Sequence, residues 1–138
     1  MENRIMMRVL SKRCNIAIIR NMLGAMLIDN NPTITFINEL KTIVSEAITN
    51  AIVHGYDNNE DYYIDILIEI TNLYIYIEVK DEGCGIEDIN KAKEALYSTK
   101  SNEERSGLGF TIMELFSDEL EVISKVNEGT IIKIRKNW

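Results

Sequence analysis

Two consecutive stretches of alternating hydrophobicity constrain the fold of this chain most. Apolar residues stand at every second position from Ile64 to Ile70 and again from Leu73 to Val79, with only Thr71 and Asn72 between the two runs. A period of two is typical of strands that bury one face. The pattern therefore predicts an antiparallel hairpin with a tight turn.

Helical periodicity predicts what covers this hairpin. Apolar residues recur at three- and four-residue steps from Ile16 to Leu27 and from Ile37 to Ala51. This spacing predicts a first helix that ends near Asp29–Pro32 and a second helix over about residues 34–53.

The rest of the chain completes a two-layer pattern. We expect a first strand over residues 4–10, weak helical character around 89–96, a helix over 109–116 and a final hairpin of 120–126 with 130–135. Because strands and helices do not strictly alternate, the fold class is predicted to be α+β. Helices would lie on one face of a mixed, mostly antiparallel sheet, in a single domain spanning residues 1–138.

Charge and cysteine content exclude several classes of protein. The net charge of −7 argues against direct nucleic-acid binding, which depends on basic patches. Cys14 and Cys84 are the only cysteines and form no CxxC pair, so neither a zinc ribbon nor a redox motif is expected. We expect no signal peptide, because Arg4, Arg8, Lys12 and Arg13 interrupt the apolar residues near the N-terminus, and no run reaches the ~18 apolar residues that a membrane span needs. We therefore expect a cytoplasmic protein with no membrane partner.

The second predicted helix carries a carboxylate and an amide on one side. Glu46 and Asn50 are four residues apart, at the edge of the apolar stripe. A carboxylate there can accept a proton, and an amide oxygen is a hard ligand suited to Mg²⁺. An ordinary polar pair beside a helix stripe is the alternative. His54, one turn further on, fits a helix C-terminal cap better than a catalytic group.

Two glycine-containing segments complete the set of candidate sites. Asp81 follows the second alternating run, and Gly83 and Gly85 permit close approach of a ligand. A buried Asp in such a turn can accept a hydrogen bond from an adenine amino group, although an Asp-Gly turn alone would explain the pattern. The segment is not a dinucleotide-binding motif, because Asp88 stands where that motif needs its third glycine.

The second segment precedes the 109–116 helix. Gly107 and Gly109 lie where helix N-terminal N–H groups could bind phosphate, and Lys100, Arg105 and Ser106 are nearby donors. A glycine-broken loop that caps a helix is the alternative. The sequence contains no Walker A motif.

Taken together and in this order, the segments Glu46–Gly55, Asp81–Ile86 and Ser106–Phe110 resemble the N, G1 and G2 boxes of the GHKL superfamily of ATP-binding proteins. The likeness runs from Arg4 to about Lys136 and is closest to the anti-sigma serine kinases of spore-forming bacteria. It implies the GHKL, or Bergerat, ATP-binding fold. The apolar segment 14–19 departs from the family pattern on a surface that could face a partner.

The resemblance implies a role for each candidate residue. Glu46 would be the general base, Asn50 would hold Mg²⁺, Asp81 would read the adenine amino group, and residues 87–106 would form an ATP lid. The remaining nucleotide contacts would be Gly83, Gly85 and Thr130 on the adenine side, and Lys100, Arg105, Ser106, Gly107 and Gly109 on the phosphates.

The resemblance also implies ligands and partners. These are ATP and ADP with Mg²⁺, a sporulation sigma factor (sigma factor F) that the chain would inhibit, and an anti-anti-sigma factor that it would phosphorylate on serine. A homodimer is implied as well. Two alternatives stay open: a non-catalytic GHKL nucleotide-binding module that sequesters a sigma factor, and an anti-sigma kinase of the general-stress branch.

Overall fold

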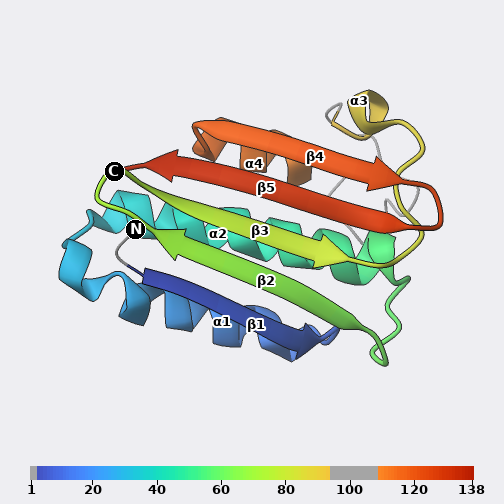
Figure 1. The fold of residues 1–138 in the computed structure, drawn as a ribbon, viewed down its shortest axis with the longest axis horizontal. Coiled ribbons are helices and arrows are strands. Elements are labelled where there is room, and N and C mark those ends of the chain that lie inside the picture. The colour runs from blue at the N-terminus through green and yellow to red at the C-terminus, as the bar shows by residue number, and fades with distance from the viewer. Residues whose placement is uncertain (1–2, 94–108) are drawn as a thin grey trace.

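The computed structural model describes residues 3–93 and 109–138, which form one antiparallel sheet with helices on one face (Figure 1). The strands are β1 (Asn3–Leu10), β2 (Tyr63–Ile70), β3 (Tyr74–Asp81), β4 (Glu119–Lys125) and β5 (Gly129–Asn137). The helices are α1 (Cys14–Met26), α2 (Ile34–Asn50), α3 (Ile89–Ala92) and α4 (Gly109–Phe116), with a 3₁₀ turn η1 (Ile28–Asn30) and a π-helical turn η2 (Ala51–Gly55).

The sheet has the strand order β1-β2-β3-β5-β4. Every pairing among these strands is antiparallel, so the largely antiparallel α+β fold is confirmed. The mixed character that we expected is not observed, because the described strands contain no parallel pair. β5 lies between β3 and β4, so the last strand of the chain is inside the sheet and β4 is at the edge.

The predicted hairpin of β2 and β3 forms, with a wider turn than the sequence suggested. The inward-facing residues of β2, from Ile64 to Ile70, are buried at every second position. The turn is set by Thr71, whose Oγ1 accepts hydrogen bonds from the backbone N–H groups of Leu73 and Tyr74 at 3.1 and 3.0 Å. Leu73 therefore belongs to the turn and is 69% exposed, so its predicted place on the buried face is wrong.

Helices α1, α2 and α4 cover the same face of the sheet (Figure 1). α2 begins where the Thr33 side chain accepts a hydrogen bond from the N–H of Phe36 at 3.0 Å, an N-terminal cap. Its buried residues form the centre of the core with β2, β3 and β5: Leu40, Ile43, Val44, Ala47 and Ile48. The predicted helix over about 34–53 is confirmed, but its last turn is π-helical.

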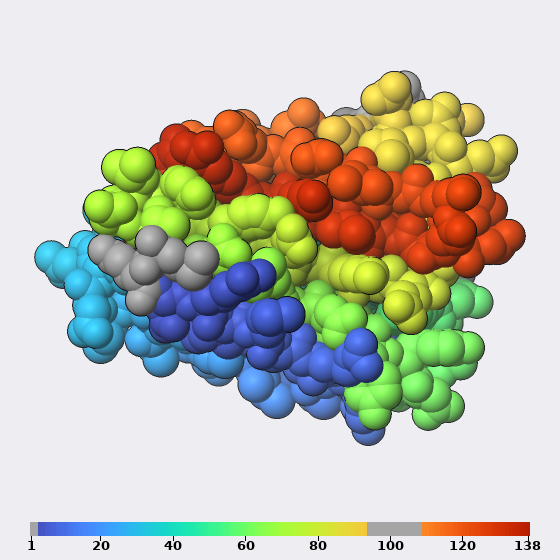
Figure 2. Space-filling model, viewed as in Figure 1, coloured from blue at the N-terminus to red at the C-terminus, as the bar shows by residue number. Residues whose placement is uncertain are grey.

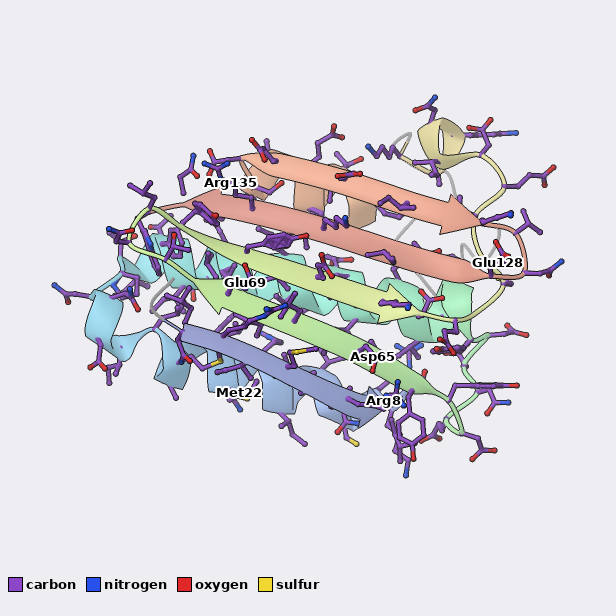
Figure 3. The ribbon with its side chains drawn as sticks, in the orientation of Figure 1. Arg8, Met22, Asp65, Glu69, Glu128 and Arg135 are labelled. Carbon is purple, nitrogen blue, oxygen red and sulfur yellow. The ribbon has the colours of Figure 1, made fainter. Side chains whose placement is uncertain are left out.

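The opposite face of the sheet is open (Figure 2). Ion pairs join its neighbouring strands: Arg8 lies beside Asp65 at 2.7 Å (Figure 3), and Arg4 lies 3.3 Å from Glu69. This arrangement explains the alternation in the sequence, because one side of each strand meets the helices and the other meets water. Among the residues that the structure describes, no helix combines the length and apolarity needed to cross a membrane.

Candidate functional site

The candidate site lies at the end of the sheet where β3 ends and α2 gives way to the π-helical turn. Asp81 is the last residue of β3 and is only 3% exposed. Its Oδ1 accepts a hydrogen bond from the N–H of Gly83 at 2.9 Å. Thr130, also buried, is the partner of Asp81 in the β3–β5 register. The structure thus brings together three residues that the sequence placed in one candidate site.

The pKa of the Asp81 carboxyl group is higher than usual. Burial raises its pKa from the ordinary value near 4 to about 6, although hydrogen bonds from the backbone of Gly83 and Thr130 oppose the rise. The carboxylate form is therefore kept at neutral pH, but at a cost in desolvation. A ligand that donates a hydrogen bond to this carboxylate would offset part of that cost.

Glycines allow the π-helical turn to touch the segment after β3. A Cβ atom at Gly55 would lie 2.7 Å from the carboxylate carbon of Asp81, and a Cβ atom at Gly83 would lie 1.9 Å from the backbone oxygen of Gly55. Neither position has room for a side chain. The two glycines therefore set how closely the end of α2 approaches Asp81.

The other wall of the site comes from the β4–β5 hairpin. Ser124 Oγ lies 2.8 Å from Thr130 Oγ1 and accepts a hydrogen bond from the N–H of Ile86 at 2.7 Å. Gly85 has a φ of +74°, and a Cβ atom there would lie 2.1 Å from the backbone oxygen of Lys125. The segment that contains Gly83 and Gly85 is thus fixed between α2 and β4, as expected for one wall of a binding site.

Glu46 and Asn50 lie on the last two turns of α2. Asn50 is 5% exposed and is the last residue before the π-helical turn, whereas Glu46 is half-buried. No hydrogen bond joins the Asn50 carboxamide to another of the described residues. The carboxamide is not among the fully buried side-chain atoms without a partner, which in the described residues are Ser11 Oγ and Ser117 Oγ, so its oxygen stays accessible and is suited to a ligand or a metal ion. The π-helical turn that follows it packs against β3 and β5, which links Asn50 to Asp81.

The predicted phosphate side is described only at its end. Gly109 is buried and is the first residue of α4, which packs against α2. Lys100, Arg105, Ser106 and Gly107 lie outside the described residues, as does most of the segment assigned to an ATP lid. Within that segment the structure describes residues 87–93, including α3, which Asp88 caps through the N–H of Lys91 at 3.1 Å.

Three residues near Asp81 were not singled out from the sequence. Gly55 touches the carboxylate, Tyr56 donates and accepts hydrogen bonds beside it, and Ser124 contacts Thr130. The sequence signal for Gly55 was present, because a glycine that ends a helix can mark a close approach as well as a stop. No local pattern indicates Tyr56 or Ser124.

His54 is the basic residue in the last turn of the π-helical segment, which agrees with its predicted place at the end of the helix.

Known proteins match this chain over nearly its whole length. The model of the histidine kinase-like ATPase domain matches residues 11–136. An anti-sigma F factor of Clostridium botulinum (strain Eklund 17B / Type B) is 44% identical over 137 residues, which covers 99% of this chain and 96% of that protein. An anti-sigma F factor of Geobacillus kaustophilus (strain HTA426) is 41% identical, covering 99% of this chain and 94% of that protein.

Solved structures share the fold at low sequence identity. The RsbU and RsbW domains of a Mycobacterium tuberculosis protein superpose with a TM-score of 0.69 at 14% identity, over 97% of this chain and 31% of that longer chain. The histidine kinase domain of a blue-light activated kinase from Erythrobacter litoralis gives 0.56 at 23% identity, over 73% of this chain and 44% of that chain. The fold resemblance and the much higher identity to the two relatives agree, and they show that this chain belongs to the anti-sigma F factor family, built on the histidine kinase-like ATPase domain.

Proposed function

We propose that this chain is an ATP-dependent protein serine kinase that also acts as an anti-sigma factor. It would bind and inhibit sigma factor F, and it would phosphorylate a serine of an anti-anti-sigma factor. The observation that supports this most is the buried Asp81 carboxylate at the end of β3, enclosed by Gly55 and Gly83, in a chain whose relatives are named anti-sigma F factors.

Adenine recognition would depend on Asp81. The carboxylate accepts the hydrogen bond of the adenine amino group, and Thr130 lies beside it on β5 as a second contact. Gly83 and Gly85 form the adjoining wall, where a side chain would meet backbone atoms. A buried acceptor of this kind favours a base that presents a donor, because an unpaired buried carboxylate is costly.

Asn50 fits as the protein ligand of a Mg²⁺ ion. Its carboxamide is buried and makes no hydrogen bond with the other described residues, and Mg²⁺ takes few protein ligands beside phosphate oxygens and water. Bound Mg²⁺ would neutralise negative charge on the phosphates during transfer. The described residues contain no cluster of three or more His, Cys, Asp or Glu side chains that could hold a metal by itself.

Glu46 would act as the general base. It would accept the proton of the acceptor serine hydroxyl while the serine oxygen forms a bond to the γ-phosphorus. The bond between that phosphorus and the β,γ-bridging oxygen breaks, and ADP leaves with the bonding electrons. The phosphates would be bound from the other side by Lys100, Arg105, Ser106, Gly107 and Gly109.

We further propose that the active form is a homodimer, which light scattering of the purified protein can test.

The decisive experiment is phosphoryl transfer from γ-labelled ATP to candidate anti-anti-sigma proteins of the same genome. We expect label on a serine of one candidate, and co-purification of sigma factor F with the chain in the presence of ATP. Asn50→Ala should abolish the Mg²⁺ dependence of ATP binding. Nucleotide binding and sigma capture without transfer would instead favour the non-catalytic module, and capture of a different sigma factor would favour the general-stress branch.

A further inference from the structure

The segment that follows Asp81 is held from two sides, by the end of the π-helical turn with Tyr56 directly after it and by the β4–β5 hairpin. Four hydrogen bonds reach it from outside: Glu82 N to Tyr56 Oη at 2.7 Å, Cys84 N to Gly55 O at 2.9 Å, Asn127 N to Cys84 O at 2.7 Å, and Ile86 N to Ser124 Oγ at 2.7 Å. Two of these bonds use side-chain hydroxyls. The bond from Glu82 is the one nearest to Asp81, because the two residues share a peptide group.

Tyr56 is placed to hold that peptide group still. The residue is 7% exposed, and its hydroxyl donates to the backbone oxygen of Tyr63 at 2.6 Å while it accepts from Glu82 N. Burial raises the pKa of the phenol above its ordinary value, so the hydroxyl keeps its proton. Its ring stacks on that of Tyr62, with centroids 4.9 Å apart. The hydroxyl thus joins the start of β2 to the end of β3 from a rigid position.

We propose that Tyr56 is a positioning residue that orients the Asp81 carboxylate and so sets the preference for adenine, an inference that rests on the proposed ATP site. The peptide group between Asp81 and Glu82 is planar, so fixing the Glu82 N–H fixes the ψ angle of Asp81. The Asp81 side chain then turns back to accept from Gly83 N at 2.9 Å. Together these bonds determine where the carboxylate points.

Tyr56→Phe removes this control without removing the ring. Glu82 N and Tyr63 O would lose their partner, and the turn after Asp81 could adopt other orientations. A nucleotide that needs the carboxylate would bind more weakly. A nucleotide that does not donate to it would be unaffected, which separates a positioning role from a general loss of structure.

The experiment compares ADP with inosine diphosphate, whose base carries an oxygen in place of the amino group. Calorimetry would measure both affinities for the wild type, for Tyr56→Phe and for Tyr62→Phe, the matched control that removes a hydroxyl from the 51% exposed ring of the same stack. We expect Tyr56→Phe to weaken ADP binding by about tenfold, as for one lost hydrogen bond, and to change inosine diphosphate binding by less than twofold. Tyr62→Phe should change neither.

Each other outcome overturns the proposal in a distinguishable way. Equal weakening of both nucleotides would show that Tyr56 is structural, and unchanged affinity for both would show that it does not act on Asp81. In either case, a wild type that prefers ADP would leave the proposed ATP site intact. A wild type that binds both nucleotides equally would overturn the adenine site itself. A double-mutant cycle completes the test: in an Asp81→Asn background, Tyr56→Phe should cause no further loss of ADP affinity, and additive losses would contradict coupling.

Discussion

The buried polar side chains near the two ends of α2 differ in how they are hydrogen-bonded. At the N-terminal end, Lys136 is 8% exposed, and its ammonium group donates to Glu39 Oε2 at 2.7 Å and to the backbone oxygen of Phe116 at 2.6 Å. It also lies 5.2 Å from the ring centroid of Phe36. Trp138 stacks on the same ring, with centroids 4.9 Å apart. Every one of these contacts joins elements of the fold.

At the C-terminal end, the buried polar side chains are less well compensated by hydrogen bonds within the fold. Asn50 makes no hydrogen bond with other described residues, and the pKa of Asp81 is raised to about 6 because burial outweighs its backbone hydrogen bonds. The comparison teaches that burial of a polar residue does not by itself mark a site. Among the described residues, Ser11 Oγ and Ser117 Oγ are also buried without a hydrogen-bond partner, so open hydrogen-bonding capacity marks a site only together with other features, here the raised pKa of Asp81 and the glycines packed around it.

The strongest test applies the same substitution at both ends of the helix. Glu46→Gln should slow phosphoryl transfer by ~10²–10⁴ in single-turnover assays, because the proton acceptor is lost, while ATP affinity is kept. Glu39→Gln, the matched control, should leave transfer unchanged and lower thermal stability, because it weakens the bond to Lys136. Wild-type transfer by Glu46→Gln would make Glu46 a structural residue and favour the non-catalytic module.

The next largest effect is expected for the buried lysine. Lys136→Met should lower the free energy of unfolding by about 2–3 kcal/mol, because Glu39 and the Phe116 carbonyl lose a charged partner. Chemical denaturation measures this change, and ADP affinity should stay the same. Lys125→Met, which breaks the exposed ion pair with Glu128, should cost less than about 0.5 kcal/mol. A loss of ADP affinity in Lys136→Met would erase the contrast between the two ends.

Asp81→Asn should have the opposite effects to Lys136→Met: it should weaken ADP binding and leave stability unimpaired. It should weaken ADP binding by ~1.5–3 kcal/mol, roughly 10- to 150-fold, because the new amide presents a donor toward the adenine amino group. The nucleotide-free protein should be as stable as the wild type or more stable at pH 7, because a desolvated charge is removed. Calorimetry and denaturation on the same sample measure both quantities. Unchanged ADP affinity would remove Asp81 from the adenine site.

The smallest expected effect is a pH dependence. The folded-state pKa of Asp81 is raised, so its contribution to stability is fully present below pH ~4 and is lost as the pH rises through about 6. ADP binding needs the carboxylate and should run the other way, falling about tenfold from pH 7 to pH 5. Both slopes should be absent in Asp81→Asn. An ADP affinity that is flat from pH 7 to pH 5 would show that the carboxylate does not bind the base.

The sequence by itself determined the elements and named the candidate residues of the site. Alternation in β2 and β3 and helical spacing in α1 and α2 are local patterns, each set by which side of one element is buried, and the structure bears them out. The sequence placed Asp81 directly after its strand and Asn50 within its helix, whereas in the structure Asp81 is the last residue of β3 and Asn50 is the last residue of α2 before the π-helical turn. The local pattern failed at Leu73, where a side-chain hydrogen bond to the backbone decided the turn.

Only the tertiary structure decided which residues meet. The π-helical turn places Gly55 against Asp81, Tyr56 reaches Glu82 across 26 residues of sequence, and Lys136 reaches Glu39 across 97. No periodicity encodes these contacts, because they depend on how α2 lies across β3 and β5 after the core has packed. The availability of Asn50 and Asp81 for a ligand is a property of the same kind, since it follows from the hydrogen bonds that the assembled fold does not make.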